Sequence, residues 1–237
     1  MSSPLSNGDA PTLGRLNGVP VKVPRASWAL LVLIWGGLAW IAGKRRPQRS
    51  WPARLLAGAL ALPVALLCEV GHVWGHTVSA RIAGTPMDTI LFPVGMPRTL
   101  YADTAVPPHT HRTRALGGVG FNALALLGGL LCRWATPPSS FARELADLFC
   151  AGNGWLIVAS LTPMPFVDGG SILKWTLVEQ GRTEAEAAAI VRGSCAVIGV
   201  GLAAAGTLAL ARGQRLPGVA LIGGGVSGLA AARDLLR

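Results

Sequence analysis

An apolar stretch at residues 55–67 leads directly into the sequence Cys-Glu-Val-Gly-His-Val-Trp-Gly-His at residues 68–76. The two stretches together are long and apolar enough to form a membrane helix, which would carry Glu69 into the membrane. A charged carboxylate at that depth costs a few kcal/mol or more, so such groups are usually paired, metal-bound or catalytic. Any fold for this chain must therefore supply a partner for Glu69.

Three other residues of this stretch are of the types that bind metals. On a helix Cys68, His72 and His76 recur every four residues and share one face, and Glu69 lies close to that face because it precedes His72 by three residues. A thiol, two imidazoles and a carboxylate are the ligand types that bind zinc. The stretch therefore predicts a metal site on a membrane helix.

The composition indicates a membrane protein. Of the 237 residues, 51% are hydrophobic and only 14% are charged. The net charge of +10 is assigned to basic residues at the membrane surface, because no basic stretch is interleaved with aromatic residues as in a nucleic-acid-binding protein. The four cysteines lie in or beside apolar segments and predict no disulfide framework. We expect an integral multi-pass protein surrounded by lipid, with a bacterial cell membrane as the expected location.

Hydrophobic segments divide the chain into three regions. Residues 1–25 are polar and are expected to form a disordered tail. Residues 26–212 are expected to form a membrane-embedded domain with its core at about 55–175, and residues 213–237 a Gly-rich last helix. Five or six spans are predicted, at about 27–42, 55–83, 115–134, from about 148 onward, 185–211 and 219–235.

Two further patterns add detail to this all-α membrane architecture: a short β segment and a glycine-rich helix. Residues 84–113 are interrupted by Gly and Pro, and the segments 89–92 and 98–101 read as short strands, which predicts a small β segment after the metal helix. In the third span Gly117, Gly118 and Gly120 predict close contact with another helix.

Asp168 is a second acid in apolar surroundings. Pro163 and Pro165 are expected to open the helix before it, which frees backbone groups that only a protein-lined cavity can satisfy. If this segment packs against the metal helix, Asp168 can join Cys68 and His72 and leave a fourth position for water, as in catalytic zinc sites. Glu69 would then be a general base, and the chemistry would be metal-assisted amide hydrolysis.

Three segments resemble, in order, the signatures of the site-2 protease family of intramembrane zinc metalloproteases. Residues 68–72 are similar to its His-Glu-x-x-His helix, residues 117–122 to its Gly-Pro-x-x-Asn segment, and residues 161–170 to its Asn-x-x-Pro-x-x-Pro-x-Asp-Gly motif. Residues 81–95 also resemble the strand-containing segment that follows the metal helix in this family. The resemblance covers residues 55–175.

The resemblance implies a three-helix membrane core with one zinc ion that cleaves transmembrane protein substrates near the membrane face. By position it makes His72 and Asp168 zinc ligands and Glu69 the catalytic base. Asn122 and Asn153 would lie near the substrate or its oxyanion, although both asparagines could equally join helices by hydrogen bonds.

The main departure from the family is Cys68, which stands in place of the first histidine. Three interpretations remain open. Zinc is held by Cys68, His72 and Asp168, or by His72, His76 and Asp168, or the site has lost its metal and the protein binds or regulates membrane clients. A thiolate ligand would donate more charge than imidazole and make zinc a weaker Lewis acid.

The C-terminal segment allows a third function. Residues 219–229 read as a strand, a Gly-x-Gly-x-x-Gly turn and a helix, which resembles the opening of a dinucleotide-binding domain. Such a site needs an acidic residue about 20 positions further on, and the sequence stops at Arg237. A last membrane helix is therefore favoured over the N-terminal part of a dinucleotide-dependent oxidoreductase. The favoured function is an intramembrane zinc endopeptidase, and the sequence predicts neither membrane orientation nor oligomeric state.

Overall fold

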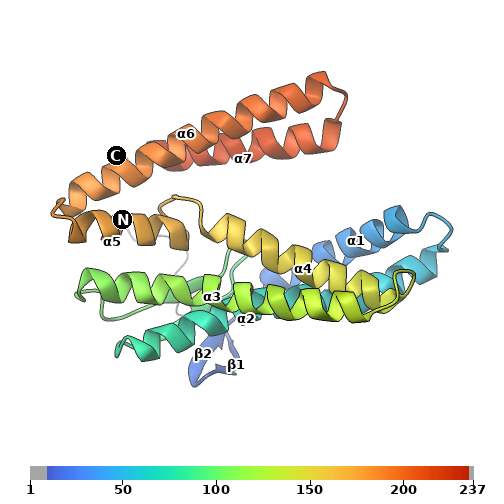
Figure 1. Ribbon diagram of the computed structural model, residues 1–237, viewed down its shortest axis with the longest axis horizontal. Helices are drawn as coiled ribbons and strands as arrows, with labels where there is room; N and C mark the ends of the chain where they lie inside the picture. The colour runs from blue at the N-terminus through green and yellow to red at the C-terminus, as the bar shows by residue number, and fades with distance from the viewer. Residues whose placement is uncertain (1–9, 235–237) are drawn as a thin grey trace. The chain divides into compact units, whose positions relative to one another are not determined.

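The computed structural model describes residues 10–234 and is dominated by helices (Figure 1). These residues form two compact units, each described by itself below: an N-terminal unit of residues up to 106 together with 116–158, and a C-terminal unit of residues 107–115 and 159 onward. The elements in chain order are β1 (Thr12–Leu16), β2 (Val19–Lys22), α1 (Ser27–Arg45), α2 (Trp51–Ile82), β3 (Thr89–Leu91), β4 (Arg98–Leu100), α3 (Pro108–Ala135), α4 (Phe141–Ser160), α5 (Asp168–Glu179), α6 (Glu184–Ala211) and α7 (Arg215–Asp234).

Four helices are long and apolar enough to cross a membrane: α1, α2, α3 and α6. The protein is therefore an integral multi-pass membrane protein, as the sequence predicts. The other two expected spans are also helical, as α4 and α7. The first two turns of α4 carry Arg143, Glu144 and Asp147, so its apolar part begins only at about residue 148. Membrane crossing by α4 and α7 stays a prediction.

A four-stranded sheet in the order β1-β2-β3-β4 belongs to the N-terminal unit. β3 and β4 are the small antiparallel pair expected after the metal helix. β2 runs parallel to β3, with Val21 opposite Ile90. The side chains of Val19 and Ile90 are buried against Val73 of α2, so the sheet is fixed to this helix by an apolar core.

The hairpin of β1 and β2 corrects the expectation of a disordered tail over residues 1–25. Residues 12–22 are ordered strands, while residues 1–9 lie outside the described part of the chain. Asn17 and Gly18 both have positive φ, 49° and 78°, which is the two-residue turn that matches the twist of antiparallel strands. This Asn-Gly pair between Leu16 and Val19 is the sequence signal of the hairpin.

Ion pairs join the α1–α2 loop to the start of α4. Arg46 and Arg49 both donate to the Glu144 carboxylate, with Arg49 reaching both oxygens at 2.8 Å. Burial raises the pKa of Glu144, but the hydrogen bonds from these two arginines outweigh it and hold the pKa below its ordinary value. One turn later Arg133 of α3 pairs with Asp147 at 2.8 Å. The two carboxylates near the start of α4 are thus paired with arginines of the α1–α2 loop and of α3.

Helices α2 and α3 approach closely because glycines face each other. A Cβ atom on Gly75 would overlap the backbone carbonyl of Gly117, and a Cβ atom on Gly118 would overlap the imidazoles of two α2 histidines. A Cβ atom on Gly120 would meet no atom within 4 Å among the described residues. Two of the three glycines predicted for close packing therefore make that contact, and they bring α3 against the metal-type residues of α2.

In the C-terminal unit α6 and α7 form a helical hairpin (Figure 1). α6 begins with a capping box in which Thr183 and Glu186 exchange hydrogen bonds, and Gly199 of α6 packs against the backbone of Gly225 in α7. The Gly-x-Gly-x-x-Gly motif therefore lies inside a helix, where it serves helix packing. The alternative expectation of a strand and dinucleotide turn over residues 219–229 is not met.

We expect Gly75→Ala to lower the free energy of unfolding by about 1–3 kcal/mol, because its methyl group must displace the backbone of α3. Gly120→Ala is the matched control, since it adds a methyl group to the facing helix in open space and should be neutral or slightly stabilising. Denaturant unfolding of the purified protein in detergent measures both. Equal stability of the two variants would contradict the close contact.

Candidate metal site

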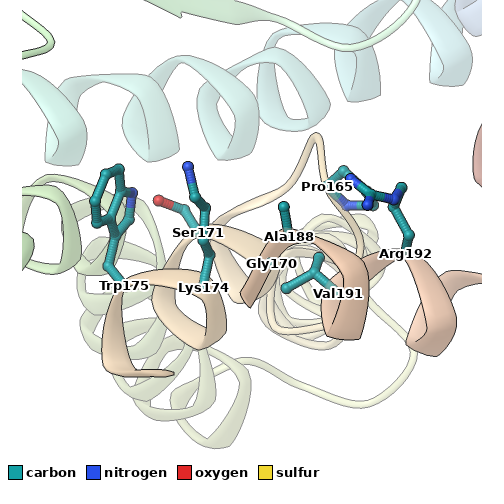
Figure 2. Close-up of a pocket in the computed structure, with 8 residues that line it drawn as sticks. All are labelled: Pro165, Gly170, Ser171, Lys174, Trp175, Ala188, Val191 and Arg192. Carbon is teal, nitrogen blue, oxygen red and sulfur yellow. The ribbon is translucent and has the colours of Figure 1, made fainter. Parts of the chain in front are cut away.

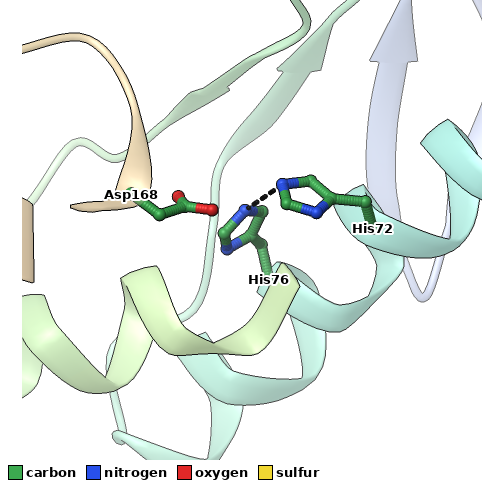
Figure 3. Close-up of side chains that lie close together, drawn as sticks. All are labelled: His72, His76 and Asp168. Carbon is green, nitrogen blue, oxygen red and sulfur yellow. Dashed lines mark hydrogen bonds between the residues drawn. The ribbon is translucent and has the colours of Figure 1, made fainter. Parts of the chain in front are cut away.

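The two histidines of α2 form a close pair. Their Nε2 atoms lie 3.1 Å apart, and the rings meet edge to face with centroids separated by 4.7 Å (Figure 3). His76 is 5% exposed and His72 is half-buried. The pair results from the four-residue spacing on the helix, and Gly118 of α3 leaves the space that the two rings fill.

Asn122 accepts a hydrogen bond from His72. Its Nδ2 atom donates to Asn153 Oδ1 at 2.8 Å and is 3.5 Å from the Cys68 carbonyl oxygen, which identifies the two ends of the amide. The Oδ1 atom of Asn122 therefore faces His72 Nδ1, at 2.5 Å. Because an amide oxygen only accepts, Nδ1 of His72 donates the hydrogen bond to Asn122.

Asn153 continues this chain of hydrogen bonds into α4. Its amide nitrogen donates to the Phe149 carbonyl at 2.8 Å and lies 3.3 Å from the Cys68 sulfur. Asn122 and Asn153 are both fully buried. The two asparagines therefore join α2, α3 and α4, as interhelical hydrogen bonds would. Their role near a substrate or oxyanion stays a prediction.

The Cys68 thiol is directed toward α4. The side chain is 2% exposed, and its sulfur lies 3.4 Å from the Val64 carbonyl and 3.8 Å from the Phe149 carbonyl, besides the contact with Asn153. The potential metal ligands Cys68, His72 and His76 of α2 thus lie in two different environments. His72 and His76 face Gly118 and Asn122 of α3, whereas Cys68 packs with α4. Zinc binding by Cys68 stays a prediction.

Glu69 lies on α2 one turn before His72 and is half-buried. Residues 69, 72 and 76 are spaced by three and four, so they follow one stripe of the helix. This places a carboxylate next to the histidine pair on the same helix. The position is the one that the sequence predicts for a general base, and the catalytic role itself stays a prediction.

Asp168 belongs to the C-terminal unit, where it is the first residue of α5. The chain leaves α4 at residue 160 and turns before α5 begins, so the helix break expected at Pro163 and Pro165 is present. Gly169 and Gly170 pack under this turn, and a Cβ atom on Gly170 would overlap the Met164 carbonyl. The glycines therefore let α5 begin directly beneath the turn, and this sets the backbone position of Asp168.

The histidine pair fits a zinc ion. Zinc–nitrogen bonds of 2.0–2.1 Å in tetrahedral geometry hold two ligand nitrogens about 3.3 Å apart. The two Nε2 atoms are 3.1 Å apart, so a small rotation of either ring gives that separation. Asn122 accepts the hydrogen bond from the other nitrogen of His72, which is the outer contact that orients metal-binding histidines.

No protein family model matches the chain, and no curated protein matches its sequence. Among solved structures, the site-2 protease from Methanocaldococcus jannaschii superimposes with a TM-score of 0.61. The match covers 96% of this chain and 95% of the other, at 16% sequence identity. The protein has the site-2 protease fold. The sequence resemblance, which rests on three short motifs in residues 55–175, thus extends to nearly the whole chain at the level of the fold.

Sequence reasoning missed two features of this site-2 protease-like structure. The contact of Asn122 with His72 links residues 50 positions apart, and helical periodicity within one span carries no signal for it. Gly118 was assigned to helix packing in general, whereas the structure sets it against both imidazoles. The motif at residues 117–122 therefore shapes the histidine pair directly.

We expect Asn122→Leu to lower the free energy of unfolding by about 1–3 kcal/mol, because it leaves His72 Nδ1 and Asn153 Oδ1 buried without this partner. Thermal unfolding in detergent measures the change. Leu124→Ala is the control on the same helix, since the side chain of Leu124 is 73% exposed. A stable Asn122→Leu variant would show that the amide chain contributes little.

Proposed function

We propose that this protein is an intramembrane zinc metalloendopeptidase that cleaves membrane-spanning substrates. The observation that carries the proposal is the His72–His76 pair, whose Nε2 atoms lie 3.1 Å apart inside a candidate membrane span. The protease-like fold is consistent with it. A histidine pair in which an asparagine orients one ring is arranged as metal-binding imidazoles are.

The ligand set that we propose is His72, His76 and Asp168. Each of the three residues carries a side-chain atom of a type that binds zinc, and Figure 3 draws their side chains. Two imidazoles and one carboxylate form the ligand set of several catalytic zinc sites, which keep a further position open. This is the second of the three interpretations that the sequence leaves open.

Cys68 is the less favourable ligand for this chemistry. Its sulfur already lies against Asn153 and the carbonyl groups of Val64 and Phe149. A thiolate on zinc would also reduce the Lewis acidity that peptide hydrolysis needs. We therefore assign Cys68 to the packing of α2 against α4.

Glu69 is the proposed general base. Zinc, when bound, would polarise the scissile carbonyl group and make a water molecule easier to deprotonate. Glu69 precedes His72 by one turn, and its carboxylate would accept the proton of that water and deliver it to the leaving amine. Because this stripe lies within a candidate span, the scissile bond must reach membrane depth, which favours substrates that are themselves membrane-spanning.

The test compares the wild-type protein with Glu69→Gln, which keeps the shape of the side chain and removes its basicity. Both proteins, purified in detergent, should contain about one zinc ion per chain by elemental analysis. Cleavage of a model transmembrane substrate by the variant should fall by about 10²- to 10⁴-fold, the usual contribution of a general base. Equal cleavage by both proteins, or a wild-type protein without zinc, would overturn the proposal.

Cys68 itself favours a second candidate function. It replaces the first histidine expected from the family resemblance, and its thiol is engaged in helix packing. A protein that kept the fold and lost the metal would bind or regulate membrane clients without cleaving them. The experiment above separates the two functions, because this protein would contain no zinc and would leave the substrate intact.

A further inference from the structure

Four helix ends lie together at one end of the N-terminal unit: the last turns of α1 and α3 and the first turns of α2 and α4 (Figure 1). Arg45 of α1 and Arg133 of α3 both pair with Asp147 of α4, at 3.1 and 2.8 Å. Arg46 of the α1–α2 loop pairs with Glu144 of α4. Residues 43–54 and 133–147 therefore form one surface, which we name the basic end.

The basic end carries much more positive than negative charge. It contains five basic residues between positions 44 and 54 and two between 133 and 143, against the carboxylates of Glu144 and Asp147, which leaves a net charge of +5. The side chains of Glu144 and Asp147 are only 13% and 24% exposed, whereas those of Arg45 and Arg133 are 44% and 48% exposed. The arginines thus cover the two acids, and the accessible charge is positive.

Exposed tryptophans lie among these cations. Trp40 of α1, Trp51 of α2 and Trp134 of α3 are 52%, 67% and 86% exposed. Lys44 lies over the Trp40 ring, 5.6 Å from its centroid, and Arg54 lies over the Trp51 ring at 5.3 Å. Exposed indoles and cations at the ends of apolar spans are typical of the lipid head-group level. Because α1, α2 and α3 are candidate spans, the basic end belongs at the membrane–water interface.

The cations beside a cavity of about 220 Å³ in the C-terminal unit are arranged differently (Figure 2). Arg192 lies beside Pro165 and apart from Lys174, and Lys174 pairs with Glu184 at 2.8 Å. These two cations therefore do not form a common charged surface. The basic end does, and such a surface attracts anions through its summed charge, without side chains that converge on one group.

We propose that the basic end binds anionic phospholipids in preference to zwitterionic ones. Each Lys or Arg close to an anionic membrane surface strengthens binding by roughly fivefold, and juxtamembrane clusters of such residues are typical of binding to acidic lipids. The exposed guanidinium and ammonium groups donate to lipid phosphates, and the indoles contact the adjoining acyl chains. The proposal is independent of the function proposed above, because the basic end contains none of the proposed zinc ligands.

The test titrates the full-length protein in detergent with dioleoyl phosphatidylglycerol or dioleoyl phosphatidylcholine and measures the affinity for each lipid by native mass spectrometry. Wild-type protein should bind phosphatidylglycerol at least about fivefold more tightly than phosphatidylcholine. The double variant Lys44→Gln/Arg45→Gln removes two exposed charges and should weaken phosphatidylglycerol binding by at least about tenfold. Its affinity for phosphatidylcholine should stay unchanged.

The matched control is Lys174→Gln/Arg182→Gln, which removes one lysine and one arginine outside the basic end. Lys174 is ion-paired, as Arg45 is, and Arg182 is exposed, as Lys44 is. The control should keep the lipid preference of the wild type. Equal losses in the two double variants would overturn the proposal, because binding would then follow the total charge of the protein.

A measurement on the wild type decides the question if the Lys44→Gln/Arg45→Gln protein fails to fold. Raising the ammonium acetate concentration from about 50 to about 500 mM should reduce the preference for phosphatidylglycerol, because salt screens charges at the interface. A preference that does not respond to salt, or equal affinity of the wild type for the two lipids, would overturn the proposal.

Discussion

The structure depends on a chain of buried hydrogen bonds that runs from His72 through Asn122 and Asn153 to the sulfur of Cys68. Lipid offers no acceptor to a buried amide, so polar groups in a membrane helix must satisfy one another. Here they do so across three helices, and the same bonds that join α2, α3 and α4 also orient the imidazole of His72. One set of hydrogen bonds therefore both packs the helices and orients the His72 ring.

This arrangement gives Cys68 a role without zinc. In the family that the sequence resembles, the first position of the motif holds a ligand, whereas the cysteine of this chain contacts Asn153 and the backbone of α4. His76 could replace Cys68 as the second ligand on α2, because both residues are separated from His72 by four positions. Glu69 stays on the same stripe as both histidines, so the proposed base need not move with the metal.

Much of the fold follows from the sequence, because helical spans and short strands leave local patterns. The span carrying the histidines, the strand pair after it and the helix break before Asp168 were all predictable from periodicity and from Gly and Pro. The hairpin at residues 12–22 carried a signal in its Asn-Gly turn, but the expectation of a disordered tail rested on the polar composition of residues 1–25 alone. Contacts between spans, such as Asn122 with His72, left no local pattern in the sequence.

The central claim is that zinc is bound by two histidines of α2 and a carboxylate, and not by the thiol of Cys68. X-ray absorption at the zinc edge of the purified protein tests it most directly, because sulfur and nitrogen ligands differ in distance. We predict nitrogen and oxygen neighbours alone, at about 2.0–2.2 Å. A sulfur neighbour at about 2.3 Å would return Cys68 to the ligand set, and a protein without zinc would contradict the claim altogether.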